Sequence, residues 1–413
     1  MQLQLTDGTT TVTLSGTSPV TGCTYFPNTP ERKGGMYSDV TETAQVVLAG
    51  TAANIRTTVN SIERLLEQAA LRQAGGTNPK VYVNYAPVSE TAHRSEVLEG
   101  RVIWDTNPGL RRLGDTNPTV RIGVIWRRRF YWEGAETSLG TATTINNGPS
   151  GNTLTYNSVT GSLPAPVRLT MTNPGASIAT RRFYVANDVT NLFATTDQFL
   201  YVAGGSESVT WSGSANHSNN LWTINVPTAL AATLRGERYR VWAAFSSIPD
   251  NVYVRASVQT VISGVPNLGQ AGGELLASGN NGKQLMDLGA LNMPPSGYIG
   301  TSAVFSIVLS FYANFGGSAT LLWVMIAPAH TTLDLRQAGY NIATNQAVVH
   351  DGIEGVDYLS LASKYPGIER TGELLLYPGQ QNKLRFLWDE GNTFNAARQL
   401  SVAGVYRPRR LLV

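Results

Sequence analysis

The chain has 413 residues, of which 42% are hydrophobic and only 14% charged, and its formal net charge at pH 7 is +3. This length exceeds one ordinary hydrophobic core, so we expect about two or three domains. The low charge and the 41 glycines are typical of β-rich structural proteins. So small a net charge predicts no strong non-specific attraction to nucleic acid or to anionic membranes.

A single cysteine, Cys23, excludes an intramolecular disulfide and zinc sites that need several cysteines. We expect it to be a small buried residue. The first residues lack a basic start followed by an apolar core, so we expect no secretory signal. The most apolar stretch, Ala303 to Ala329, contains Asn314 and two glycines near its middle. It therefore predicts two buried strands joined by a turn, and not a membrane span.

The N-terminal residues predict a hairpin, an arm and a strand. Residues Gln2 to Leu14 alternate around Asp7 and Gly8, which is a strong hairpin signal. The next segment, Ser15 to Asp39, is rich in glycine, proline, threonine and asparagine. An irregular segment of this length is either a functional arm or disordered. Strand alternation returns from Val40 to Ala49.

One stretch, Thr51 to Gly76, predicts a long amphipathic helix, because its apolar residues recur at helical spacing on one side. These residues are Ile55, Val59, Ile62, Leu66 and Ala69. Thr51 is the expected N-cap, and Gly75 with Gly76 is the expected stop. Nearly all other segments predict strands and turns, so we expect this to be the one long helix, lying across a sheet.

Three strands are expected after the helix, over Val81 to Tyr85, Arg94 to Trp104 and Thr119 to Trp132. The last one carries three consecutive arginines, of which only Arg127 and Arg129 share a face. Two arginines are a weak footprint for phosphates, so we expect them to form ion pairs between subunits. With two aromatic residues of the arm, they make up the candidate subunit interface. The set is Tyr25, Phe26, Arg127 and Arg129.

Residues Gly134 to Ser162 are poor in large apolar side chains and dense in glycine, threonine, serine and asparagine, which indicates a domain boundary. We expect a first domain over residues 1–140, a linker over 141–162 and a second domain over 163–413. Many short strands separated by turns favour a β-sandwich or jelly roll for the second domain. At about 250 residues this domain has room for two sub-sheets or an added decoration.

No catalytic constellation emerges. The chain has only four histidines as candidates for acid–base chemistry. Its sequence contains neither a phosphate-binding loop nor a GxSxG nucleophile turn. His350 with Asp351, Glu354 and Asp357 is the densest group of potential metal ligands, but its spacing matches neither HExxH nor an EF-hand loop. We expect a solvated acidic turn there, with a bound cation as the alternative. We therefore expect no enzyme activity, no catalytic residue, no metal site and no cofactor.

Aromatic residues crowd one part of the second domain. They are Trp211, Trp222, Tyr239, Trp242, Phe245 and Tyr253. Core packing is the commoner fate of such residues in alternating strands, whereas an aromatic platform on a sandwich face is how such domains hold sugar rings. The candidate carbohydrate-binding residues are the first four of the group, from Trp211 to Trp242.

The order of these elements resembles the tail-tube fold of the tube and distal tail proteins of long-tailed bacteriophages. The resemblance rests on Leu3 to Leu14, Thr51 to Gly76, Arg94 to Trp104 and VRIGVIWRRRFYWEG at Val120 to Gly134. The segments Leu374 to Trp388 and Tyr406 to Val413 also look like the endings of phage structural proteins. The resemblance implies a mainly β protein: a tail-tube-like β-sandwich with one long helix, then a jelly-roll or galectin-like β-sandwich as in the distal tail protein.

The resemblance also implies a structural protein of the phage tail, in the tube, the distal tail or the baseplate. Such a protein forms a homo-oligomeric ring, a hexamer or a trimer, around a channel for DNA or the tape measure. The implied partners are tube, tail-hub and tape-measure proteins, with DNA only as passing cargo and no membrane. The implied location is the virion, after assembly in the host cytoplasm. Closing a sheet around a ring would also remove its exposed edges.

Two other hypotheses stay open. A carbohydrate-binding adhesion module, free-standing or within the same tail protein, would recognise host surface glycans. A glycan-degrading enzyme would need two carboxylates facing each other across a groove, and the sequence places no such pair.

Overall fold

The computed structural model describes residues 1–104, 118–148, 151–179, 182–189, 207–214, 221–225, 238–262, 265–271, 273, 275–277, 284–292, 304–337, 341–360, 364–365, 368–390 and 394–413. The chain forms two compact units. Unit 1 consists of residues 1–137, 160–163 and 407–413, and unit 2 of residues 138–159 and 164–406. Over these described residues the fold is mainly β with one long helix, as the sequence predicts.

Unit 1 is built on one nine-stranded antiparallel sheet. Its strands are β1 (Gln2–Thr6), β2 (Thr11–Thr13), β3 (Val20–Thr24), β6 (Val40–Ala49), β7 (Val81–Ala86), β8 (His93–Trp104), β9 (Thr119–Arg128), β10 (Trp132–Glu133) and β33 (Arg409–Arg410). The order is β2-β1-β7-β8-β9-β6-β3, and β10 joins β33 to β8. A separate two-stranded ribbon consists of β4 (Arg32–Lys33) and β5 (Met36–Tyr37).

The predicted hairpin and helix of unit 1 are confirmed. Strands β1 and β2 pair across a turn in which the Asp7 carboxylate accepts the backbone N–H groups of Thr9 and Thr10. Helix α1 (Ala52–Gln73) begins after Thr51, whose hydroxyl accepts the N–H of Asn54. The helix ends at Gln73. Gly75, two residues later, adopts a φ of +96°, a conformation that suits glycine.

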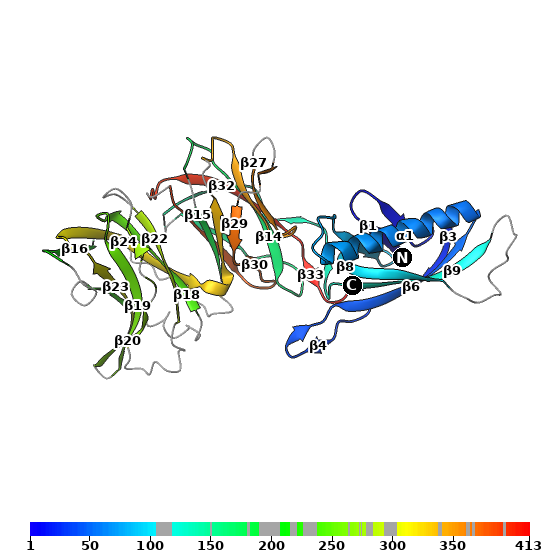
Figure 1. The fold of residues 1–413 in the computed structure, drawn as a ribbon, viewed down its shortest axis with the longest axis horizontal. Helices are drawn as coiled ribbons and strands as arrows, with labels where there is room; N and C mark the ends of the chain where they lie inside the picture. The colour runs from blue at the N-terminus through cyan, green and yellow to red at the C-terminus, as the bar shows by residue number, and fades with distance from the viewer. Residues whose placement is uncertain are drawn as a thin grey trace. The chain divides into compact units, whose positions relative to one another are not determined.

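Helix α1 covers one face of this sheet (Figure 1). The predicted apolar stripe is buried, with Leu65 in addition, against inward residues of β1, β6, β7 and β9. The closest approach is to β8, where a Cβ on Gly100 would lie 2.7 Å from Leu66 Cδ2 and 2.5 Å from the Ile125 carbonyl oxygen. Only glycine fits this crossing. No helix among the described residues is long and apolar enough to span a membrane.

Unit 2 contains two β-sandwiches, one inserted into the other. Sandwich A packs two sheets around one core. Its first sheet contains β11 (Thr137–Ser138), β12 (Thr143–Asn146), β14 (Ala165–Thr172), β26 (Ala347–Asp351), β27 (Val356–Ser360), β28 (Lys364–Tyr365), β30 (Leu375–Leu376) and β32 (Gln399–Tyr406). The second contains β13 (Thr153–Tyr156), β15 (Arg182–Val189), β25 (Thr332–Gln337), β29 (Ile368–Thr371) and β31 (Asn382–Trp388).

Sandwich B lies between β15 and β25 in the chain and has its own core. One sheet contains β16 (Glu207–Trp211), β18 (Arg238–Ser247), β22 (Gln284–Asn292) and β24 (Gly317–Pro328). The other contains β17 (Leu221–Asn225), β19 (Tyr253–Ile262), β20 (Val265–Ala271), β21 (Leu275–Leu276) and β23 (Val304–Tyr312). A single 3-10 turn, η3 (Ala329–Thr331), returns the chain to sandwich A.

Two parts of the expected domain organisation are corrected. The predicted linker over 141–162 contains β12 and β13, which pair with β32 and β31. These two strands were not predicted, because their segment is rich in small polar residues and the strands with which they pair lie far along the chain. The expected second domain also does not extend to the C-terminus, since residues 407–413 belong to unit 1.

The two sandwiches are joined by an apolar cluster and by an ion-pair network. Arg240 of β18 bonds Asp287 of β22 and reaches Asp334 of β25 at 2.7 Å, while Arg182 of β15 lies 3.9 Å from Asp287. Each sandwich therefore supplies an arginine to an aspartate of the other. Tyr184 stacks edge-on against Trp242 in the adjacent apolar cluster, with ring centroids 5.6 Å apart.

We predict that Asp334→Asn lowers the free energy of unfolding by about 3 kcal/mol, because Asp334 is fully buried and its loss leaves Arg240 under-compensated. The matched control is Arg336→Ala, which removes a half-exposed partner of the same carboxylate and should cost about 1 kcal/mol or less. Urea titration measures both variants. Equal losses would contradict the assignment of Asp334 to the junction.

Candidate functional site

The face of the unit 1 sheet opposite α1 is open over β6, β9 and β8. Side chains on this face alternate with the buried ones, and the strand register aligns them in rows. One row is Thr41, Arg127 and Glu99, and the next is Thr43, Ile125 and Arg101. We call this surface the open face. Its exposed members are Thr41, Thr43, Gln45, Glu99, Arg101, Ile103 and Arg121, with Arg127 and Ile125 partly exposed.

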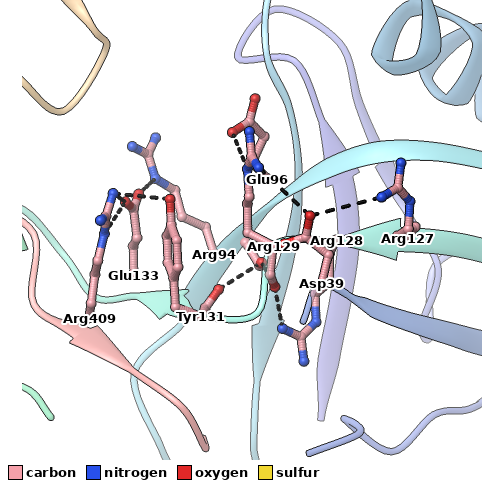
Figure 2. Close-up of polar contacts among 10 residues, drawn as sticks. Asp39, Arg94, Glu96, Arg127, Arg128, Arg129, Tyr131, Glu133 and Arg409 are labelled. Carbon is pink, nitrogen blue, oxygen red and sulfur yellow. Dashed lines mark hydrogen bonds and ion pairs between the residues drawn. The ribbon is translucent and has the colours of Figure 1, made fainter. Parts of the chain in front are cut away.

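A line of alternating charges runs along one end of the open face. Asp39 lies 3.9 Å from Arg127 and 3.7 Å from Arg129 (Figure 2). Arg127 also donates to Glu99 at 2.8 Å, and Arg129 to Glu96 at 3.4 Å. The side chains of Arg127 and Arg129 keep 42% and 38% of their surface exposed. Such half-exposed pairs contribute little to stability, but their charges are available to a partner.

Arg128 points the other way, into the sheet, and fixes the root of the arm. It donates to the Glu42 carboxylate at 2.6 Å, and both side chains are fully buried. The other Glu42 oxygen accepts the Tyr25 hydroxyl at 2.6 Å, and the Asn28 N–H donates to Glu42 at 2.9 Å. Arg128 also lies 4.2 Å over the Trp132 ring. Charge and hydrogen bonds therefore compensate most of this buried pair, with Arg128 Nε left without a partner, and hold residues 25–28 on the sheet.

The arm beyond this root carries exposed apolar side chains. Phe26 is 79% exposed and Met36, on the β4–β5 ribbon, is 76% exposed. The predicted irregular segment is thus partly regular, because β3 and this ribbon lie within it. A cavity of about 430 Å³ lies between the arm and β6. Its lining residues are Asn28, Thr29, Glu31, Lys33, Ser38, Asp39, Val40 and Thr41.

A second ion-pair group ties the C-terminal residues to unit 1. Glu133 accepts from Arg94 at 3.2 Å and from Arg409 at 3.3 Å (Figure 2). Arg409 also lies 4.0 Å over the Tyr131 ring and donates to its hydroxyl. Strand β33 is therefore held by side chains as well as by its pairing with β10.

The structure divides the four predicted interface residues. Phe26, Arg127 and Arg129 present exposed surface. Tyr25 does not, since it is only 2% exposed and packs against Tyr85 and Trp126. The expectation that Tyr25 contributes its ring to a subunit surface is wrong, because the buried Glu42 carboxylate requires its hydroxyl inside. Cys23 is half-buried, and this burial raises the pKa of its thiol to about 11.

The candidate aromatic platform, the alternative to core packing, is not on the surface. Trp211, Tyr239 and Trp242 are 5%, 0% and 1% exposed, and the Trp211 indole donates to the Phe315 carbonyl at 2.8 Å. They fill cores because inward positions of these strands demand large side chains. The side chain of Trp222 lies outside the described residues. Because they are buried, the three described residues cannot stack on a sugar.

The expected acidic turn is also different. His350 is fully buried, with Nδ1 2.6 Å from Asp357, which lies 3.6 Å from Arg370. Asp351 pairs with Arg168 at 2.7 Å. These carboxylates serve ion pairs and not a solvated turn. Over the described part of the chain, no group of histidine, cysteine, aspartate and glutamate side chains could hold a metal ion.

Sequence reasoning missed the Glu42–Arg128 pair. The signal was present, since β6 alternates strictly and Glu42 falls on its apolar side between Val40 and Ala44. A charged residue at an inward strand position predicts a buried partner.

Comparisons with known proteins identify no family. No protein-family model matches the chain, and no curated protein matches it. Among solved structures, the chain is similar to the VP2 subviral particle of infectious bursal disease virus at 9% identity and a TM-score of 0.16, covering 67% of this chain and 80% of that one. A structure of the Gx strain of the same virus is similar at 10% identity and a TM-score of 0.14, covering 98% of this chain and 63% of that one. Likenesses at such scores carry no argument about fold or function.

We predict that alkaline pH loosens the arm root through Tyr25. Burial, and then the Glu42 charge, raise the pKa of the Tyr25 hydroxyl, so the folded state keeps its proton where the unfolded state loses it. The stabilisation is complete below the unfolded pKa of about 10 and is lost as pH rises above it.

The matching variant is Tyr25→Phe, followed by denaturant titration from pH 7 to pH 11. At pH 7 it should be less stable by about 1–3 kcal/mol, because Glu42 loses a donor. Its stability should also fall less steeply above pH 10 than that of the parent. Parallel pH profiles would show that Tyr25 does not carry this dependence.

Proposed function

We propose that this chain is a structural protein of a bacteriophage tail, in the tail tube or at the distal tail. In this role copies of the chain assemble into a homo-oligomeric ring, a trimer or a hexamer, around a channel for DNA or the tape measure. The ring would dock tube, tail-hub and tape-measure proteins in the virion, after assembly in the host cytoplasm. No catalysis belongs to this function.

The observation that carries the proposal is a sheet covered on one side only. Helix α1 buries one face of unit 1, whereas the open face presents threonine, glutamine, arginine and isoleucine side chains to solvent. Within the described residues, the edge strands β2 and β3 each pair with a single neighbour. A sheet with a bare face and two unpaired edges is suited to joining further copies, which cover the edges.

Two further features support an interface between copies. The exposed Phe26 and Met36 supply apolar anchors on a protruding arm, and such anchors dominate binding energy when a partner buries them. The alternating line from Glu99 to Glu96 supplies half-exposed charges of both signs, which set orientation more than affinity. The buried Glu42–Arg128 pair holds both features in fixed positions relative to the sheet.

We predict that Arg127→Glu with Arg129→Glu disrupts assembly of the purified chain. The two changes place a fourth and a fifth negative charge beside Asp39, Glu96 and Glu99 at half-exposed positions, so each subunit should still fold. Light scattering should give a ring mass for the parent chain and a monomer or partial assembly for the double variant.

The matched control is Arg56→Glu, on the exposed side of α1 away from the open face. It should keep the mass of the parent. A parent chain that is monomeric at every concentration tested would contradict the proposed ring. A ring mass that is unchanged in the double variant would show that the line of alternating charges is not part of the interface.

A further inference from the structure

Sandwich B carries an exposed pair of tyrosines on its β17–β23–β19–β20 sheet. Tyr253 of β19 and Tyr312 of β23 are directly opposite each other in the register, with ring centroids 6.0 Å apart and planes inclined by 58°. They are 38% and 47% exposed. Leu276 of β21, opposite Tyr253 on its other side, is 38% exposed. Three neighbouring strands thus present one apolar row to solvent.

The two exposed tyrosines do not belong to the hydrophobic core of sandwich B. The next residues inward, Val254 and Phe311, are fully buried in sandwich B. The tyrosines therefore stand on the outer side of a sheet whose inner side is already packed. Alternating strands normally place polar residues outside, so an aromatic pair there indicates a contact surface.

The exposed polar residues near the pair are neutral. Along the outer side, the register places Ser310 opposite Arg255, Val308 opposite Ser257 and Ser306 opposite Gln259. Ser257, Ser306, Val308 and Ser310 are buried, so this part of the outer side is not open to a ligand. Arg255, the one charged residue among these described outward positions, is half-buried and engaged in an interaction of its own. Exposed Asn251 and Asn314 each lie two residues along the chain from a tyrosine.

We propose that Tyr253 and Tyr312 form a binding site for the pyranose rings of a neutral glycan. The apolar C–H face of a sugar packs on an aromatic ring, and neighbouring amide and hydroxyl groups bond its hydroxyls. Two inclined rings make a shallow seat that holds one sugar against both. Tyrosine suits this use because it offers a large, rigid surface with a polar end and little entropy to lose.

Charge argues for this ligand over the alternatives. A nucleic-acid strand would need several basic side chains for its phosphates, and the described outward positions hold only Arg255, which is already engaged. A neutral polyhydroxylated ligand matches the two exposed tyrosine rings and the exposed amides of Asn251 and Asn314. The inference does not rest on the proposed tail function, because a glycan site in sandwich B needs no ring.

The test is native gel electrophoresis of the full chain through gels containing one soluble neutral polysaccharide each: mixed-linkage β-glucan, galactomannan, hydroxyethyl cellulose or dextran. The parent chain should be retarded by at least one of them. In the retarding gel, Tyr253→Ala with Tyr312→Ala should weaken binding by about tenfold or more, because both rings are lost.

Two variants keep the test decisive. Tyr253→Phe with Tyr312→Phe retains both rings, so it should bind within about threefold of the parent. Leu71→Ala removes an exposed apolar side chain from α1 and should leave retardation unchanged. Absence of retardation in all four gels overturns the proposal, as does full binding by the alanine pair. A changed oligomeric mass of the alanine pair also overturns it, because the rings would then be a contact between copies.

Discussion

The buried ion pair between Glu42 and Arg128 is the interaction on which unit 1 depends. Both side chains are withdrawn from water, a costly state that the ion pair and the hydrogen bonds to its other atoms offset, although Arg128 Nε has no partner. Glu42 receives Arg128, Tyr25 and the Asn28 backbone, while Arg128 is further held by carbonyl groups and the Trp132 ring. The pair therefore joins β6, β9 and the arm. It explains how an otherwise irregular segment can present Phe26 and the β4–β5 ribbon at fixed positions.

The chain is organised by insertion. In the sequence, unit 2 is inserted into unit 1 after residue 137. The last seven residues belong to unit 1 again, and there Glu133 and Tyr131 bind Arg409. Sandwich B is in turn inserted into the sequence of sandwich A between β15 and β25, and the ion pairs of Arg240 join the two sandwiches. At both insertions, buried or half-buried arginines bridge segments that are far apart in sequence. Arginine suits this because its planar guanidinium bonds two carboxylates or a carboxylate and a ring at once.

Local patterns predicted the elements whose cause is local. The helix follows from the spacing of Ile55, Val59 and Ile62, and the opening hairpin from Asp7 and Gly8, because periodicity and turn chemistry act within a few residues. Long-range pairing was beyond reach. The residues around Thr143 do not indicate that their strand pairs with β32, and those around Arg409 do not indicate a pairing with β10. The same limit applies to the site residues: Tyr25 was expected at a subunit surface, and for Trp242 a sugar-binding face was the alternative to core packing, but burial depends on partners that a single sequence does not display.

In the proposed assembly, further copies of the same chain complete the sheet of unit 1. Electron microscopy of negatively stained, purified full-length chain tests it most directly, because subunits are counted in the images. We expect closed rings with threefold or sixfold symmetry and a central opening, alone or stacked into tubes. A field of single, separate molecules at concentrations where the chain is otherwise folded would contradict it.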